Sequence, residues 1–352
     1  MKLFTCKHCG QPLYFENYYC ENCGMQLGFD PGMLEFIPFI NNNNGAPVPS
    51  DANDTNIYRF CNNRIYNVCN WLVEPTNTEG LCLACELNRT IPDLNNPEYV
   101  QRWQTLELAK HRLVYSLLRL KLPLASKIKN PSTGLLFDFK ADGTKKVLTG
   151  HDEGVITINI AEADDIEREM ARRNMEEVYR TVLGHFRHEV GHYYWDRLIA
   201  DTPYHQPFKA LFGDEQQDYE EALKAHYANG APANWNLQYI SAYASAHPWE
   251  DWAETWAHYL HIIDTLETAY AFGVGIHPAA KIATTDLDMA VTTNPYHMRD
   301  FSRVIDAWLP LTIVLNSLNR SMGHGDAYPF VIYPPVLEKL RFIHSVCHPG
   351  TM

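Results

Sequence analysis

The sequence has no long apolar run. Its most apolar later segment, Trp308 to Leu315, is interrupted by Pro310 and falls far short of the roughly 20 residues that cross a bilayer. The first residues, MKLFTCKHCG, soon become polar and offer no apolar stretch of about 7 to 15 residues, which a signal peptide needs. We therefore expect neither a membrane span nor export, and we predict a cytoplasmic protein.

Positive charge is also scarce. The 352 residues include 29 Lys and Arg against 42 Asp and Glu, which gives a formal net charge of -13. Affinity for nucleic acid depends on basic side chains that neutralise phosphates, so the composition disfavours nucleic acid as a partner. The hydrophobic content of 46% is that of a globular chain with one large core and room for a small accessory module.

Cysteine, in contrast, is abundant and ordered, because eight of the nine cysteines fall into two groups of four. The first group consists of two C-x-x-C pairs, Cys6 with Cys9 and Cys20 with Cys23, each followed by a glycine. A C-x-x-C turn lets two thiolates converge on one ion, and four thiolates satisfy tetrahedral zinc. In a reducing compartment such spacing favours metal over disulfides. We predict a zinc ribbon over residues 1–30.

The second group is less regular and consists of Cys61, Cys69, Cys82 and Cys85. Only its last two members form a C-x-x-C pair. We predict a second structural zinc here, and the alternative is a pair of buried thiols beside an apolar cluster that includes Trp71 and Leu72. Residues 41–56, rich in Asn, Pro and Asp, indicate a flexible connection between the two groups. Residues 31–95 are thus predicted to hold a linker and a second zinc module.

Residues 96–352 are predicted to form one α+β domain that is mostly helical. Asn96 suits a helix N-cap and Pro97 the first helical position, and apolar residues follow at helical spacing. Alternating residues at 135–140 and 155–160 predict strands of a small sheet. Further helical patterns start at Met175 and cover about 249–272, 299–320 and 334–346.

The helical pattern that starts at Met175 contains the motif His188-Glu189-Val-Gly-His192. Side chains four positions apart lie one turn apart on the same side of a helix, so both imidazoles can address one ion. In zinc peptidases with this motif, the glutamate takes the proton from the metal-bound water. We predict His188 and His192 as ligands of a catalytic zinc and Glu189 as the general base.

A third ligand is predicted where Pro248 opens a helix. Glu250 falls in the first turn of this helix, and Glu254 lies one turn later on the same face. Such a pair can give one carboxylate to the zinc and one to support a ligating histidine. We predict Glu250 as the ligand and Glu254 as the support, and leave the reverse order open. A solvated acidic face is the alternative, although three tryptophans lie among these residues.

These motifs resemble a known family. HEVGH followed by HPWEDWAETWAHYLH is similar to the bacterial zinc-binding metallopeptidases that carry an N-terminal zinc ribbon. The resemblance covers nearly the whole chain, including CNWL at 69–72, LNRTIPDL at 87–94 and SMG…DAYPF near the end. It implies a zincin fold, a zinc-ribbon module in front of the metallopeptidase domain, and peptide hydrolysis.

A more distant resemblance concerns the helix with E-x-x-A-E, which is similar to that of gluzincin toxins. In those proteins the first Glu binds zinc, and a Tyr seven residues earlier assists the reaction. Tyr243 occupies that offset from Glu250. The resemblance implies that Tyr243 donates a hydrogen bond to the oxyanion of the tetrahedral intermediate. A purely structural role for Tyr243 is the alternative.

Together, these patterns predict a zinc-dependent peptidase with one catalytic and one or two structural Zn2+ ions. Its substrate is expected to be a peptide or protein, and its ribbon is expected to offer a docking surface to a protein partner. The competing hypothesis is an inactive, zinc-stabilised adaptor that binds partners through the ribbon module.

Overall fold

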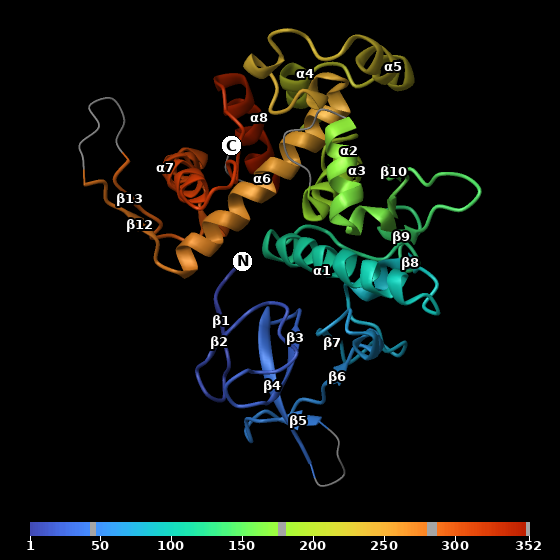
Figure 1. The fold of residues 1–352 in the computed structure, drawn as a ribbon, viewed down its shortest axis with the longest axis vertical. Helices are drawn as coiled ribbons and strands as arrows, with labels where there is room; N and C mark the ends of the chain where they lie inside the picture. The colour runs from blue at the N-terminus through green and yellow to red at the C-terminus, as the bar shows by residue number, and fades with distance from the viewer. Residues whose placement is uncertain (43–46, 175–180, 280–286, 350–352) are drawn as a thin grey trace. The chain divides into compact units, whose positions relative to one another are not determined.

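The computed structural model describes residues 1–42, 47–174, 181–279 and 287–349. Over these residues the fold is α+β, as predicted, with eight α-helices and several small sheets (Figure 1). None of the described helices is both long enough and apolar enough to cross a membrane.

The chain divides into two compact units. The N-terminal unit comprises Leu3–Glu169, and the C-terminal unit comprises Met1–Lys2 together with Met170–Met352. This division lies inside the segment 96–352, so the three domains expected from the sequence stay a prediction. Each unit is described below by itself.

The first part of the N-terminal unit is built from short antiparallel strands. A hairpin joins β1 (Phe4–Thr5) to β2 (Pro12–Leu13). A three-stranded sheet follows, in the order β3 (Gln26–Asp30), β4 (Glu35–Asn41) and β5 (Pro47–Pro49). A second antiparallel pair joins β6 (Arg59–Phe60) to β7 (Leu72–Val73).

Part of the segment 41–56 is a strand, although its composition indicates a flexible connection. Val48 pairs with Ile40, so β5 extends the sheet next to β4. An edge strand tolerates the prolines that flank Val48, because their missing amides are not needed by a further neighbour. Residues 43–46 of the segment lie outside the described residues.

An aromatic core holds the N-terminal unit together. Trp71 packs against Phe29 with ring centroids 4.8 Å apart, and Tyr115 packs against Phe15 at 5.6 Å. Trp71 lies between Cys69 and Cys82, two cysteines of the second group, and Tyr115 comes from α1 (Pro97–Arg119). Each such ring buries about 150–250 Å². The cysteine-bearing segments and α1 therefore share one core.

The rest of the N-terminal unit is α1 and a four-stranded sheet. As predicted, Asn96 caps α1 by accepting a hydrogen bond from the Glu98 amide at 3.0 Å, and Pro97 opens the helix. The two predicted strands are the inner strands of the sheet. Its order is β10 (Gly150–Asp152), β11 (Val155–Asn159), β9 (Leu136–Lys140) and β8 (Asn88–Thr90), with β9 parallel to both of its neighbours.

The C-terminal unit is mainly helical. After α2 (Asp165–Asn174), its elements are α3 (Val182–Leu198), α4 (His205–Phe212), α5 (Tyr219–Asn229), α6 (Pro248–Ala271), the pair β12 (Gly275–Ile276) and β13 (Met289–Ala290), α7 (Phe301–Ser321) and α8 (Pro334–Cys347). The helical pattern predicted from Met175 is described only from Thr181, whose side chain caps α3 by accepting from the Gly184 amide. Its residues 175–180 lie outside the described residues.

The close packing of α3 against α6 positions the candidate site. A Cβ atom on Gly191 of α3 would lie only 3.0 Å from the Cα of Ala253, so glycine lets the two backbones approach. The Trp252 indole N–H donates to the Gly191 carbonyl at 2.8 Å, and Trp256 stacks on Tyr194 with centroids 5.2 Å apart. Apolar and aromatic contacts thus fix the two helices against each other.

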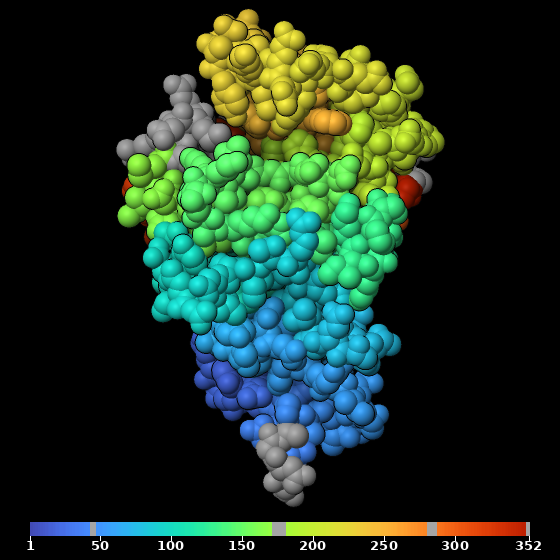
Figure 2. All heavy atoms as spheres, turned by 90° about the vertical axis from the view of Figure 1, so that its right-hand side faces the viewer, coloured from blue at the N-terminus to red at the C-terminus, as the bar shows by residue number. Residues whose placement is uncertain are grey.

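The segment that holds α4 and α5 covers the N-terminal half of α6. Phe208 and Phe212 of α4 pack on Trp252, with ring centroids 6.0 and 5.8 Å from it. Asp218 caps α5 by accepting from the Glu221 amide at 2.9 Å. In the space-filling view this segment forms a continuous surface, coloured yellow (Figure 2).

Candidate metal centres

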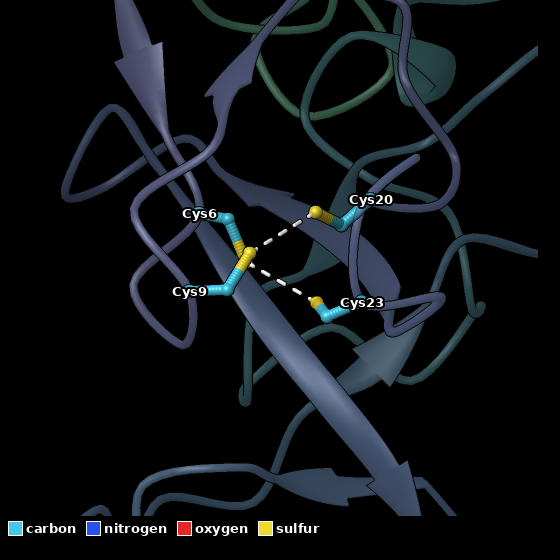
Figure 3. A group of neighbouring side chains, drawn as sticks. All are labelled: Cys6, Cys9, Cys20 and Cys23. Carbon is cyan, nitrogen blue, oxygen red and sulfur yellow. Dashed lines mark hydrogen bonds between the residues drawn. The ribbon is translucent and has the colours of Figure 1, made fainter.

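The first group of cysteines gathers two loops of the N-terminal unit. Cys6 and Cys9 lie between β1 and β2, and Cys20 and Cys23 precede β3, so the two pairs face each other (Figure 3). The Sγ atoms of Cys6 and Cys23 are 3.8 Å apart, and those of Cys9 and Cys20 are 3.5 Å apart. A zinc ion with Zn–S distances of about 2.3 Å places its sulfurs about 3.8 Å apart, so the four thiols fit tetrahedral zinc.

The glycine after each pair shapes these loops. Gly10 and Gly24 have φ angles of +76° and +72°, a conformation that side chains other than glycine rarely adopt. Their amides donate to the carbonyls of Cys6 and Cys20, both at 2.8 Å, which closes each turn under its two thiols. The sequence C-x-x-C-G therefore encodes the local geometry of a knuckle.

The second group is also brought together, in the core of the N-terminal unit. All four side chains are at most 1% exposed, and their sulfur atoms lie within 4.8 Å of one another: Cys61, Cys69, Cys82 and Cys85. The amides of Trp71 and Cys82 point at the sulfurs of Cys69 and Cys61, both at 3.4 Å. Such N–H···S contacts stabilise thiolates around a metal. We refer to the two groups as the thiolate centres.

The third group joins α3 to α6. His188 and His192 lie one turn apart on α3, and Glu250 lies in the first turn of α6. The two Nε2 atoms are 3.3 Å apart, and Glu250 Oε2 lies 3.1 Å from His188 Nε2. Each of the three residues offers a ligand atom within 4.8 Å of the others. We refer to this group as the His–Glu centre.

One buried atom of the His–Glu centre lacks a hydrogen-bond partner. Glu250 is 1% exposed, and its Oε2 atom accepts no hydrogen bond from the described residues, although it faces the imidazole of His188. Leaving a buried carboxylate oxygen unsatisfied is costly. A cation between Glu250 and the two imidazoles would satisfy it, so the residues fit a metal ion.

The electrostatics of the His–Glu centre also favour a bound cation. Burial lowers the pKa of His188, but Glu250 and Glu254 outweigh burial and hold that pKa well above its ordinary value. Burial also raises the pKa of Glu250, but His192 and His188 outweigh it and hold that pKa well below the usual range. The low-dielectric surroundings therefore keep Glu250 ionised and favour positive charge beside it.

Glu254 lies on the opposite side of the His188 ring from Glu250. One of its oxygens is 2.7 Å from His188 Nδ1, and the other accepts from the Ser241 hydroxyl at 2.6 Å. Burial opposes ionisation, but His188 outweighs it and lowers the pKa of Glu254 to about 2. The structure thus brings Glu254 next to His188, and its supporting role stays a prediction. Ser241 belongs to no motif and has no fixed offset from Glu254, so it could not be predicted from the sequence.

Glu189 and Tyr243 also belong to this region of the C-terminal unit. Glu189 follows His188 on α3 and is 6% exposed. Tyr243 opens the short 3-10 helix η5 (Tyr243–Ser245), and its ring centroid lies 6.0 Å from that of His188. Burial, followed by the charge of Glu250, raises the pKa of Tyr243, and Glu189 contributes to the rise. Its hydroxyl therefore stays protonated and can donate a hydrogen bond.

A second tyrosine, Tyr219, contacts the centre directly and was not predicted. It is the first residue of α5, and its hydroxyl donates to Glu250 Oε1 at 2.5 Å. Asp218 is a typical N-cap, so the sequence could have indicated a helix start there. Nothing in the sequence links that helix start to Glu250.

Two models of known protein families match the chain, one in the segment of the thiolate centres and one in the segment of the His–Glu centre. A family model described as "Putative zinc-binding metallo-peptidase" matches residues 99–346, and a zinc-ribbon domain model matches residues 3–96. The matched zinc-ribbon segment contains both thiolate centres.

Relatives cover nearly the whole chain. Uncharacterized proteins of Mycobacterium bovis and Mycobacterium tuberculosis are 44% identical over 347 residues, which is 98% of this chain and 95% of theirs. No solved structure matches. The resemblance inferred from the sequence is confirmed, and the chain belongs to the family of zinc-binding metallopeptidases with an N-terminal zinc-ribbon domain.

Proposed function

We propose that the chain is a zinc-dependent peptidase whose catalytic zinc is held by His188, His192 and Glu250. The observation that carries the proposal is the convergence of lone pairs in the His–Glu centre. Glu254 accepts the proton of His188 Nδ1, so a metal ion bound at Nε2, 3.1 Å from Glu250 Oε2, would take the place of the second ring proton. His192 Nε2 lies 3.3 Å from His188 Nε2, so one metal ion can be bound by both imidazoles and by Glu250.

The donor set also favours a catalytic centre over a structural one. Structural zinc sites usually have four protein ligands, mostly cysteines, whereas catalytic sites keep three protein ligands and leave one position to water or substrate. Both thiolate centres offer four sulfurs, and the His–Glu centre offers two imidazoles and one carboxylate. We therefore propose one catalytic and two structural zinc ions. The free thiols of both centres suit a cytoplasmic, reducing environment.

The chain's own residues supply the remaining chemistry. Zinc in such a site lowers the pKa of water and polarises a carbonyl group. Glu189 accepts a proton from the attacking water and returns it to the leaving amine. Tyr243 donates a hydrogen bond to the oxygen on which negative charge develops. Glu254 keeps the imidazole of His188 in the required tautomer. We assign the HExxH helix α3 and the ligand-bearing helix α6 to a zincin-like arrangement.

The direct test is the variant Glu189→Gln with the full chain and a peptide library as substrate. Cleavage is expected to fall about 100- to 10,000-fold, since a general base contributes that much, while the zinc content stays unchanged. Glu338→Gln, at an exposed position of α8, is the matched control and should behave like the unsubstituted chain. A fully zinc-loaded chain that cleaves no peptide would favour the adaptor function instead.

A further inference from the structure

The two oxygens of the Glu250 carboxylate have different surroundings. Oε1 accepts the hydrogen bond from Tyr219, and it also lies 3.7 Å from His192 Nε2. Within the described part of the chain, Oε2 accepts no hydrogen bond, and it lies 3.1 Å from His188 Nε2. Both oxygens therefore lie near an imidazole nitrogen, and Oε1 in addition accepts from the tyrosine hydroxyl.

The position of Tyr219 is fixed by the N-terminus of α6. Its ring packs edge-on against the ring of His247, with centroids 5.1 Å apart and an angle of 84° between the planes. The centroid of the Trp249 ring lies 6.1 Å from that of Tyr219. Because these neighbours immediately precede Glu250 in the chain, the hydroxyl and the carboxylate are held by the same short segment.

His247 ties this arrangement to the loop before α5. Its Nδ1 atom accepts from the Trp249 amide at 3.1 Å, which caps α6, so Nε2 carries the proton and donates to the Gln217 carbonyl at 3.2 Å. The loop at Gln217 leads directly into Tyr219. The hydrogen bond between Tyr219 and Glu250 is therefore pre-organised by packing and by two backbone contacts.

We infer that Tyr219 is a positioning residue that engages Glu250 Oε1 and so makes Glu250 a ligand through Oε2 alone. The inference rests on the proposed function. A carboxylate can bind a metal through one oxygen or through both. Without the hydroxyl, Oε1 is free to turn towards the metal as a further ligand. The hydrogen bond thus keeps one coordination position available for water and substrate.

The test is a Co2+ titration of the full chain after selective removal of the metal from the His–Glu centre by a mild chelator. Tyr219→Phe is expected to weaken Co2+ binding about 10- to 100-fold, as loss of a hydrogen bond to a metal ligand does. It should also change the visible absorption spectrum of bound Co2+, which reports the number of ligands. Tyr227→Phe, the same substitution at a 60% exposed position of α5, should match the unsubstituted chain in both.

A second pair of variants separates positioning from a general structural effect. If Tyr219 acts through Glu250, adding Tyr219→Phe to Glu250→Ala should cause no further loss of Co2+ affinity. An equal further loss, or an unchanged affinity and spectrum in Tyr219→Phe alone, would overturn the inference. His192→Ala tests the proposed function separately, because undiminished Co2+ binding in that variant would refute the His–Glu centre itself.

Discussion

In the N-terminal unit, the four thiols of the first centre come from two loops, and its first and last cysteines are 17 positions apart in the chain. The His–Glu centre, in contrast, takes its ligands from two long helices. The loops are closed by backbone hydrogen bonds from the amides of Gly10 and Gly24, and their thiols face one another. The helices α3 and α6 are fixed by aromatic contacts such as Tyr194 with Trp256. We thus expect metal binding to be required for folding of the first thiolate centre, whereas the His–Glu centre is held in place by the protein before a metal binds.

The second thiolate centre sharpens this contrast. Its four cysteines are part of the buried core, next to Trp71. Cys69 and Cys82 lie on either side of β7 in the chain. Four thiolates buried in that position without a cation would be costly. The His–Glu centre instead lies at the end of an apolar interface that exists without it. Stability and catalysis should therefore depend on different metal ions.

The largest expected effect is the response to removal of all zinc by a strong chelator. Structural zinc contributes about 10–16 kcal/mol of binding free energy in zinc-finger peptides, so the β-strands of the N-terminal unit should unfold. Helices α3 and α6 should remain folded in the same sample, which makes them the internal control. Hydrogen exchange measured by mass spectrometry distinguishes the two. If the amides of β3 and β4 stayed protected from exchange without zinc, zinc would not be required for the fold of the N-terminal unit.

A smaller effect is expected from breaking the buried ion pair between Arg187 on α3 and Asp264 on α6. Arg187 is 3% exposed, and Tyr296 donates to the other oxygen of Asp264. Arg187→Met removes the guanidinium that faces this buried carboxylate and should cost about 3–5 kcal/mol. Chemical denaturation of the C-terminal unit measures this loss.

The matched control for that pair is Arg341→Met, since Arg341 is 43% exposed and contacts Glu338 at 3.5 Å. It should change stability by about 0–1 kcal/mol. Equal effects of the two substitutions would mean that α3 and α6 are not held together in the way described.

The next effect concerns the support of His188. Glu254→Gln removes the charge that faces His188 Nδ1, so affinity for metal at the His–Glu centre should fall about 10- to 100-fold. Metal bound to the thiolate centres should not change. Competition titration with a chromogenic chelator reports both classes of site. Glu220→Gln, an exposed position on α5, is the control. Loss of thiolate-bound zinc in Glu254→Gln would show that the His–Glu centre and the thiolate centres do not bind metal independently.

The smallest effect is a pH dependence of the C-terminal unit. His344 is buried and neutral, because Tyr259 donates to its Nδ1 atom at 3.0 Å and its Nε2 faces the Arg299 carbonyl at 3.3 Å. Burial, assisted by His348, lowers the pKa of His344 to about 4. The unfolded chain therefore takes up the proton first as pH falls.

The stability that His344 contributes is complete above its ordinary pKa of about 6.5 and is lost as pH falls towards about 4. The loss should reach at most about 1.4 kcal/mol per pH unit in that window. Thermal unfolding of the unsubstituted chain and of His344→Gln between these pH values measures the difference. Identical slopes in the two proteins would exclude this role for His344.

Local features of the structure were predictable from the sequence. The N-cap at Asn96 and the two glycine-closed cysteine pairs depend on residues close together in the chain, so their spacing carries the information. The helical spacing of His188 with His192, and of Glu250 with Glu254, likewise placed these side chains on shared faces. Each prediction needed only the geometry of one element.

Features that depend on tertiary packing were not predictable. Tyr219 and Ser241 reach Glu250 and Glu254 from loops and helix ends that have no fixed offset to α6. β8 (Asn88–Thr90) joins the sheet of the metallopeptidase segment by pairing in parallel with β9, which no local pattern indicates. Such pairings follow from how elements pack, and a single sequence does not encode them by spacing.

We expect a metal ion to occupy the His–Glu centre independently of the thiolate centres. Elemental analysis of zinc per chain, for the unsubstituted protein and for His192→Ala, measures this occupancy. We predict about three zinc ions in the former and about two in the latter, with the fold retained. Equal zinc content in two folded samples would contradict this expectation.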